Sequence, residues 1–153
     1  MSNNLKVHFS SKHQAWETPS NIFNELDKEF NFNLDAAANA SNHKCERYFD
    51  IEDNGLEQDW GGQRVFLNPP YGRELRHWVK KAYEESKKPN TLIVMLIPAR
   101  TDTIYFHNYI YYKAKIRFIR GRIKFLKNRK EEDAAPFPSM IVIYDNREEI
   151  NNG

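Results

Sequence analysis

Runs of apolar residues alternate along this chain with segments in which apolar positions repeat at helical spacing. The runs at residues 64–67, 91–97 and 140–144 are mostly β-branched, aliphatic or aromatic and have the length of strands. The run at 91–97 is apolar after its first residue, as expected of a strand that helices cover on both faces. Pro98 ends this run, because proline cannot continue a sheet ladder.

Three segments have the spacing of helices. A helix is expected to start at Thr18-Pro19-Ser20, because proline fits the first turn of a helix. Its apolar positions are Ile22, Phe23, Leu26 and Phe30. In a second helix, one face carries Leu75, Trp78, Val79, Ala82 and Tyr83. A third helix is predicted over residues 103–112.

Shorter segments at 32–35, 47–50, 115–119 and 122–126 are also predicted to be strands, with Gly121 as a bulge or tight turn between the last two. Strands that alternate with helices predict an α/β sandwich with a mostly parallel central sheet. The final strands predict an antiparallel C-terminal hairpin.

Length and composition favour one folded domain. The chain has 153 residues, of which 40% are apolar and 14% aromatic. We expect a flexible N-terminus at 1–14, a single domain at 15–147 and a tail at 148–153. The only cysteine, Cys45, excludes an intramolecular disulfide framework. Because neither a signal peptide nor a membrane-spanning stretch is visible, the sequence predicts a soluble, cytoplasmic protein.

Charge is unevenly distributed, although the net charge is only +2. Residues 1–60 contain five Lys or Arg and eleven Asp or Glu, whereas residues 113–130 contain nine Lys or Arg and no acid. With Phe118 and Phe125 interleaved, this basic stretch could neutralise phosphates and stack on bases. Taken alone, it is explained equally well by a strand face that points at water.

The most specific pattern in the chain is Asn68-Pro69-Pro70-Tyr71, directly after the predicted strand at 64–67. Prolines end the ladder, so the chain must turn at the carboxyl edge of the sheet, where open α/β folds bind their ligands. The turn offers an amide, carbonyl acceptors and an aromatic ring, which suits a planar substrate with amine hydrogens to donate. A bare Pro-Pro would more simply indicate a structural turn.

Five further motifs accompany this tetrad in a fixed order. They are Trp16-x-Thr18-Pro19, Phe32-x-Leu34-Asp35-Ala36-Ala37-Ala38, Pro98-Ala99-Arg100-Thr101-Asp102-Thr103, Gly121-Arg122-x-Lys124-Phe125 and Ala135-Pro136-Phe137-Pro138-Ser139. With these motifs the chain resembles the adenine-N6 DNA methyltransferases of the small phage-type Dam family over nearly its whole length. The resemblance implies a Rossmann-like, S-adenosylmethionine-dependent methyltransferase fold, in the host cytoplasm if the gene is phage-encoded.

The resemblance also implies a cofactor site. The matched positions are Trp16, Thr18, Pro19, Asp35, Ala36, Ala37, Asp53 and Asp59. Thr18 would face the methionine part, Asp59 would bind the adenine amine, and Asp50 or Asp53 would take the ribose hydroxyls. The sequence does not distinguish these three acids, and Asp35 could instead be a helix N-cap. The family usually has glycine soon after Asp35, whereas this chain continues with residues 38–41, Ala-Asn-Ala-Ser.

The implied reaction is direct methyl transfer. The side-chain oxygen of Asn68 and the carbonyl of Pro69 would accept the amine hydrogens, and the nitrogen lone pair would attack the sulfonium methyl. The adenine must be flipped out of the duplex, and Tyr71 is expected to stack on it. No metal is expected, since His43 and Cys45 have no second pair of ligands.

DNA is the implied partner, and a separate target-recognition domain is not expected. The candidates for DNA contact are Arg73, Arg100, Arg122, Lys124 and Lys127. Specificity would come from short loops at 72–76 and 127–136, and the sequence leaves the oligomeric state open. The alternatives are methylation of RNA or of a protein glutamine, because Asn-Pro-Pro-Tyr also serves such enzymes. A non-catalytic nucleic-acid-binding relic of the fold is the alternative from another class.

Overall fold

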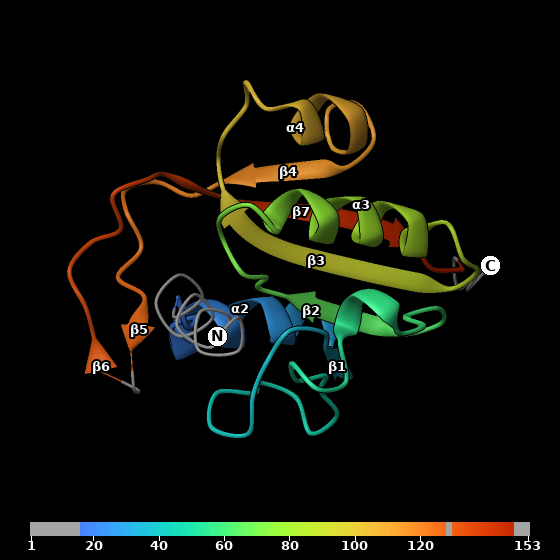
Figure 1. Cartoon of the computed structure of the whole chain (residues 1–153), viewed down its shortest axis with the longest axis horizontal. Helices are drawn as coiled ribbons and strands as arrows, with labels where there is room; N and C mark the ends of the chain where they lie inside the picture. The colour runs from blue at the N-terminus through green and yellow to red at the C-terminus, as the bar shows by residue number, and fades with distance from the viewer. Residues whose placement is uncertain (1–15, 128–129, 149–153) are drawn as a thin grey trace, which may run out of the picture.

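The computed structural model describes residues 16–127 and 130–148, and a five-stranded sheet forms its centre (Figure 1). In sheet order the strands are β1 (Leu34–Asp35), β2 (Arg64–Leu67), β3 (Thr91–Pro98), β7 (Ser139–Asn146) and β4 (Lys115–Phe118). β1, β2 and β3 pair in parallel, whereas β7 pairs antiparallel with both β3 and β4. The α/β class is confirmed. The sheet is mixed, with β7 running against the direction of the other four strands.

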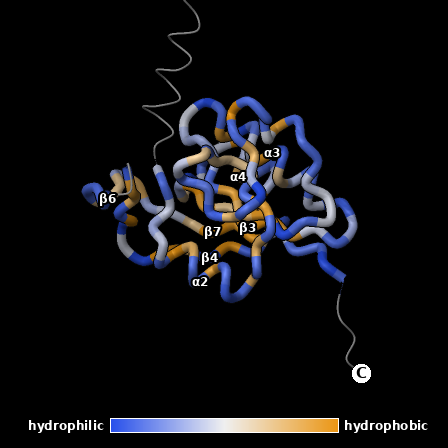
Figure 2. Tube along the Cα trace, turned by 90° about the horizontal axis from the view of Figure 1, so that it is seen from below, coloured by the Kyte–Doolittle hydropathy of each residue, from blue (hydrophilic) through white to orange (hydrophobic). Residues whose placement is uncertain are grey.

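Helices cover both faces of the sheet (Figure 2). α2 (Ser20–Phe30) lies on one face, and α3 (Leu75–Ser86) and α4 (Ile104–Tyr109) lie on the other. A short 3₁₀ helix, η1 (Gly55–Glu57), precedes β2. Within the described ranges, no helix is long and apolar enough to cross a membrane.

The helix boundaries follow from local chemistry. α2 begins directly after Pro19 and ends at Asn31, whose left-handed backbone (φ 52°) closes the last turn. Its buried residues face the sheet, where the ring of Phe23 meets the ring of Phe66 edge-on at 5.0 Å. α4 is capped by Thr103, whose hydroxyl oxygen accepts the N–H of Phe106 at 3.3 Å.

The core is concentrated on the two central strands. Every residue of β3 is buried, as are the first six residues of β7. Each fully buried aliphatic or aromatic side chain contributes about 1.5–3 kcal/mol, so this pair of strands accounts for much of the stability. The sequence prediction of a strand covered on both faces is confirmed for β3.

An antiparallel hairpin is present in the C-terminal part of the chain, as predicted, but it does not belong to the central sheet. β4 pairs with β7, and the two-stranded hairpin is formed by β5 (Leu126–Lys127) and β6 (Lys130–Glu131), outside the central sheet. Residues 122–126, predicted as a strand, mostly lack a regular ladder. The segment opposite residues 122–126 contains Pro136 and Pro138, which have no N–H to donate to a ladder. The two segments are therefore joined only by isolated hydrogen bonds, such as the one from Ala135 N–H to Ile123 O at 2.9 Å.

A second predicted strand, 47–50, is reduced to a single parallel bridge between Tyr48 and Asp35. β1 is only two residues long and offers little edge for pairing. The predicted N-terminal segment 1–14 and residues 149–153 of the predicted tail lie outside the described residues.

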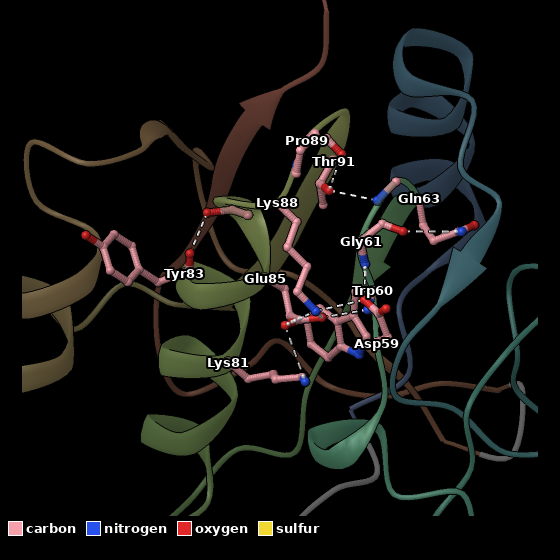
Figure 3. Close-up of polar contacts among 12 residues, drawn as sticks. Asp59, Trp60, Gly61, Gln63, Lys81, Tyr83, Glu85, Lys88, Pro89 and Thr91 are labelled. Atoms are coloured by element: carbon pink, nitrogen blue, oxygen red, sulfur yellow. Dashed lines mark hydrogen bonds and ion pairs between the residues drawn. The ribbon is translucent and has the colours of Figure 1, made fainter.

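A buried carboxylate ties α3 to the chain before β2 at the amino end of the sheet (Figure 3). Glu85 accepts the backbone N–H of Trp60 at 2.6 Å and the ammonium of Lys88 at 2.9 Å. Lys88 also pairs with Asp59 at 2.8 Å. This network stabilises the end of the sheet that lies opposite the Asn68 tetrad.

Candidate active site

The strand order reverses at β1. After β1 the chain forms the segment 47–49, which lies along the edge of β1 that faces away from β2. There the N–H of Asp35 donates to Arg47 O at 3.1 Å, and the N–H of Phe49 donates to Asp35 O at 3.0 Å. The chain then crosses to β2, which pairs with the other edge of β1. In open α/β sheets, ligands bind at the carboxyl ends of the strands where the order reverses. Here those strand ends carry Asp35 and Asn68.

A small hollow lies between these two residues, with a volume of about 40 Å³. It is lined by Trp16, Glu17, Thr18, Asp35, Ala37, Asn42, Lys44, Phe66 and Asn68. The structure therefore brings together residues of the first three motifs, which are far apart in the sequence. The hollow has room for about three water molecules, so it would enclose only part of a cofactor.

A larger hollow of about 540 Å³ lies beside α2 and shares Lys44 with the first. Its lining residues are Phe23, Asp27, Phe32, Asn33, Lys44, Cys45, Glu46 and Arg47. Asn68 and Tyr71 are not among them. The polar groups of the motifs converge on the smaller hollow, which is therefore the candidate active site.

The side-chain amide of Asn68 is held at both ends. Its nitrogen donates to the backbone oxygen of Trp16 and to the hydroxyl oxygen of Thr18, the latter at 2.9 Å. Its oxygen accepts the hydroxyl of Tyr71 at 2.7 Å. An amide oxygen has two acceptor positions, so one remains for a substrate hydrogen.

Tyr71 is buried among three other aromatic rings, those of Trp16, Phe125 and Phe137. The Trp16 and Tyr71 rings are stacked, with centroids 6.4 Å apart and planes inclined by 21°. Burial raises the pKa of the Tyr71 phenol well above its usual value, so its hydroxyl stays a donor. Stacking of Tyr71 on a base remains a prediction, and a base would have to displace one of these neighbours.

Asp35 has an incompletely satisfied carboxylate. One oxygen accepts the N–H of Lys44 at 2.9 Å, and the other, Oδ1, has no hydrogen-bond partner among the described residues. Burial raises the pKa of Asp35 to about 7, although the backbone N–H groups of Lys44 and Ala37 act against it. The predicted N-cap role is not observed, since no helix begins there. A buried, unpaired oxygen of this kind is suited to a cationic or hydrogen-donating ligand.

Of the three acids considered for the nucleoside, the structure separates Asp59 from the site. Asp59 is exposed and paired with Lys88 at the amino end of the sheet, so the prediction that it binds adenine is not supported. Asp50 and Asp53 follow the segment beside β1, at its carboxyl end. Each accepts the backbone N–H of the other, at 2.9 and 3.0 Å, in an exposed turn.

The predicted DNA contacts lie at this carboxyl edge or on the adjoining hairpin, and all five side chains are exposed. The guanidinium of Arg100 lies over the ring of Phe137, with a distance of 5.9 Å to its centroid. Arg122 donates to Ala135 O at 3.4 Å, and Lys124 is 3.8 Å from Glu131. The hairpin that carries Lys127 extends away from the sheet in Figure 1.

Sequence reasoning missed part of the site. Phe125 and Phe137 complete the aromatic cluster around Tyr71, although each lies in a motif that carried the family resemblance. Lys44 and Glu17 pair at 3.5 Å and line the hollow with Asp35. Gly55 was also missed: a Cβ there would lie 2.3 Å from the oxygen of Ala36, so only glycine allows this close backbone approach.

The comparison with known proteins decides the family. The family model of the DNA N-6-adenine-methyltransferases (Dam) matches residues 6–152. The chain belongs to this family. It is 31% identical over 140 residues to the DNA N-6-adenine-methyltransferase of Haemophilus phage HP1, a match that covers 88% of this chain and 80% of that protein. The resemblance inferred from the six motifs is thus confirmed.

A second relative is the DNA N-6-adenine-methyltransferase of Escherichia phage T1. The chain is 40% identical to it over 93 residues, which cover 60% of this chain and 38% of the T1 protein. This chain therefore matches less than half of the T1 enzyme.

Proposed function

We propose that this Dam-family protein transfers a methyl group from S-adenosylmethionine to N6 of an adenine in DNA, on a Rossmann-like methyltransferase fold. The observation that carries the proposal is the placement of Asn68 beside Asp35 where the strand order reverses. The family supplies the substrate class, and the fixed amide of Asn68 supplies the acceptor that an amine substrate requires.

The residues around the hollow fit the amino-acid part of S-adenosylmethionine. The free Oδ1 of Asp35 would accept hydrogens from the α-ammonium group, and the hydroxyl of Thr18 would face the carboxylate. Pro19 fixes the start of α2 and thus the position of Thr18, while Ala36 and Ala37 allow close approach of the backbone. Asp53, or Asp50 beside it, would take the ribose hydroxyls once their mutual hydrogen bonds open.

The chain's own residues orient the acceptor amine. Asn68 Oδ1 and the Pro69 carbonyl accept its two hydrogens, which frees the nitrogen lone pair. Pro70 keeps the turn rigid, and the flipped base lies against the aromatic cluster of Tyr71. When bound, S-adenosylmethionine supplies an electrophilic methyl on a sulfonium. A nitrogen–carbon bond forms as the carbon–sulfur bond breaks, and the extra amine proton leaves to water.

DNA would approach the carboxyl edge of the sheet. Arg73 and Arg100 follow the ends of β2 and β3, while Arg122, Lys124 and Lys127 lead into the hairpin. These exposed cations flank the aromatic cluster and could bind phosphates on either side of a flipped adenine. An enzyme acting on DNA, with relatives in phages, would work in the cytoplasm of the host cell.

The test is to incubate the protein with labelled S-adenosylmethionine and unmethylated DNA, digest the DNA and identify the labelled nucleoside. We expect N6-methyladenine with the wild type and none with Asn68→Ala. Thermal stabilisation by the cofactor should persist in Asn68→Ala, since a ligand at a hundred times its Kd adds about 2.7 kcal/mol. Label in cytosine, RNA or protein glutamine, or no label despite cofactor binding, would contradict the proposal.

A further inference from the structure

The orientation of the Asn68 amide is decided by its neighbours. The backbone oxygen of Trp16 can only accept a hydrogen bond, so the amide nitrogen must be the atom that faces it. The Tyr71 hydroxyl lies 2.7 Å from the other end of the amide and 3.0 Å from Leu96 O, and it is compatible with this assignment. The oxygen is thereby turned away from the 16–18 segment.

Thr18 is the side chain that joins Trp16 in holding the nitrogen. It is only 2% exposed, and its hydroxyl oxygen lies 2.9 Å from the amide nitrogen. The segment that carries it is itself fixed on both sides. Residue 17 exchanges two backbone hydrogen bonds with Leu126, at 2.8 and 3.2 Å, and α2 begins at Ser20.

We propose that Thr18 is a positioning residue for methyl transfer, because it holds the Asn68 amide with Oδ1 toward the substrate amine. If the amide turned over, its own N–H groups would face one hydrogen of the amine, and only the Pro69 carbonyl would remain as an acceptor. The two bonds from the amide nitrogen also polarise the amide and make Oδ1 a better acceptor. The inference rests on the proposed role of Asn68.

This role differs from binding the cofactor. As an acceptor from Asn68, the Thr18 hydroxyl keeps its own hydrogen, which it can still donate to the cofactor carboxylate. Loss of a cofactor contact raises the cofactor KM, whereas loss of amide orientation lowers kcat at saturation. The two contributions can therefore be measured separately.

The experiment compares Thr18→Val, which keeps the shape but loses the hydroxyl, with Thr18→Ser, which keeps the hydroxyl. With cofactor and DNA saturating, we expect kcat to fall about tenfold in Thr18→Val, as for one lost hydrogen bond. Thr18→Ser should recover most of that loss. If Thr18 were only a packing residue, Ser would be the more damaging change, because it removes a buried methyl group.

Thr91→Val is the matched control. Thr91 is also buried, and its hydroxyl accepts the N–H of Gly62 at 2.8 Å, but it lies at the opposite end of the sheet. We expect this variant to lose stability without a change in kcat. A parallel NMR measurement follows exchange of the Asn68 side-chain amide hydrogens, which should be slow in the wild type and faster in Thr18→Val.

The outcomes separate the two proposals. If the wild type methylates adenine but Thr18→Val keeps its kcat and only the cofactor KM rises, the positioning role is refuted. Equal losses in Ser and Val would refute it as well. If the wild type does not methylate DNA, the proposed function fails. The exchange measurement then decides the inference, and unchanged exchange in Thr18→Val would overturn it.

Discussion

Replacing Asp35 by Asn should make the protein more stable at alkaline pH while weakening cofactor binding. Asp35 is 3% exposed, and one of its oxygens has no partner in the described part of the chain. Its folded-state pKa is about 7, whereas an unfolded aspartate titrates near 3.9. The folded protein thus holds a proton that the unfolded chain releases between these two values.

The sign and size follow from this difference. Because the folded state binds the proton more tightly, Asp35 contributes its full stability below about pH 4 and loses it as pH rises through 7. Linkage between these two pKa values gives a loss of about 2.5 kcal/mol from pH 5 to pH 8. Asparagine does not titrate, so the free energy of unfolding of Asp35→Asn, relative to wild type, should increase by that amount over the same interval.

Urea unfolding followed by circular dichroism, without cofactor and in half-unit pH steps, measures this difference. Other carboxyls, such as Glu29 with its lowered pKa, change stability in the opposite direction, but they are common to both proteins and cancel. Asp102→Asn, the same substitution at an exposed position, serves as the control for the change from carboxylate to amide itself. A constant difference between Asp35→Asn and wild type, or one that shrinks as pH rises, would refute the reasoning.

Three other perturbations have distinct signatures. Tyr71→Phe removes the hydroxyl whose single hydrogen is shared between Asn68 Oδ1 and Leu96 O, so kcat should fall several-fold with the cofactor KM unchanged. Initial rates measure this, and an equal kcat would show that the hydroxyl is dispensable. Glu85→Ala leaves the buried N–H of Trp60 without its acceptor. The free energy of unfolding, measured in urea, should fall by about 2–3 kcal/mol, while the activity of the folded fraction is retained. Lys127→Ala should reduce the slope of log affinity for DNA against log salt by about one, and an unchanged slope would exclude a phosphate contact.

The parts of the fold that follow from local chemistry could be predicted from the sequence. The strand predicted at 91–97 and the helix predicted to start at Pro19 are both observed, as β3 and α2. Both follow from burial and from helix-start preferences, which act over short distances along the chain. The pairing of β4 with β7 could not be predicted, since it depends on which of two edges a strand reaches after the chain has turned. The same holds for Asp59, whose identity suggested a ligand but whose partner, Lys88, lies 29 residues further on.

The candidate site divides in the same way. Asn68 and Tyr71 stand out in the sequence because prolines separate them from the preceding strand. The contact of Thr18 with Asn68 spans 50 residues, and no periodicity indicates it. Phe137 lies between prolines that suggest a loop, yet the structure buries it against Tyr71. Such long-range contacts depend on how the sheet assembles, which single-sequence patterns do not encode.

The separation of the β5–β6 hairpin from the central sheet has an evolutionary consequence. The hairpin pairs only within itself and with residue 17 among the described strands and bridges, so its length and charges can change without disturbing the register of the five-stranded sheet. On the proposed contact between the hairpin and DNA, substitutions in the hairpin could change the DNA preference while the five-stranded sheet stays intact. Yet residue 17 immediately precedes Thr18, so a hairpin that shifts its pairing would also shift the segment that holds Asn68. The exposed residues of the hairpin can therefore vary, whereas its pairing with residue 17 is constrained.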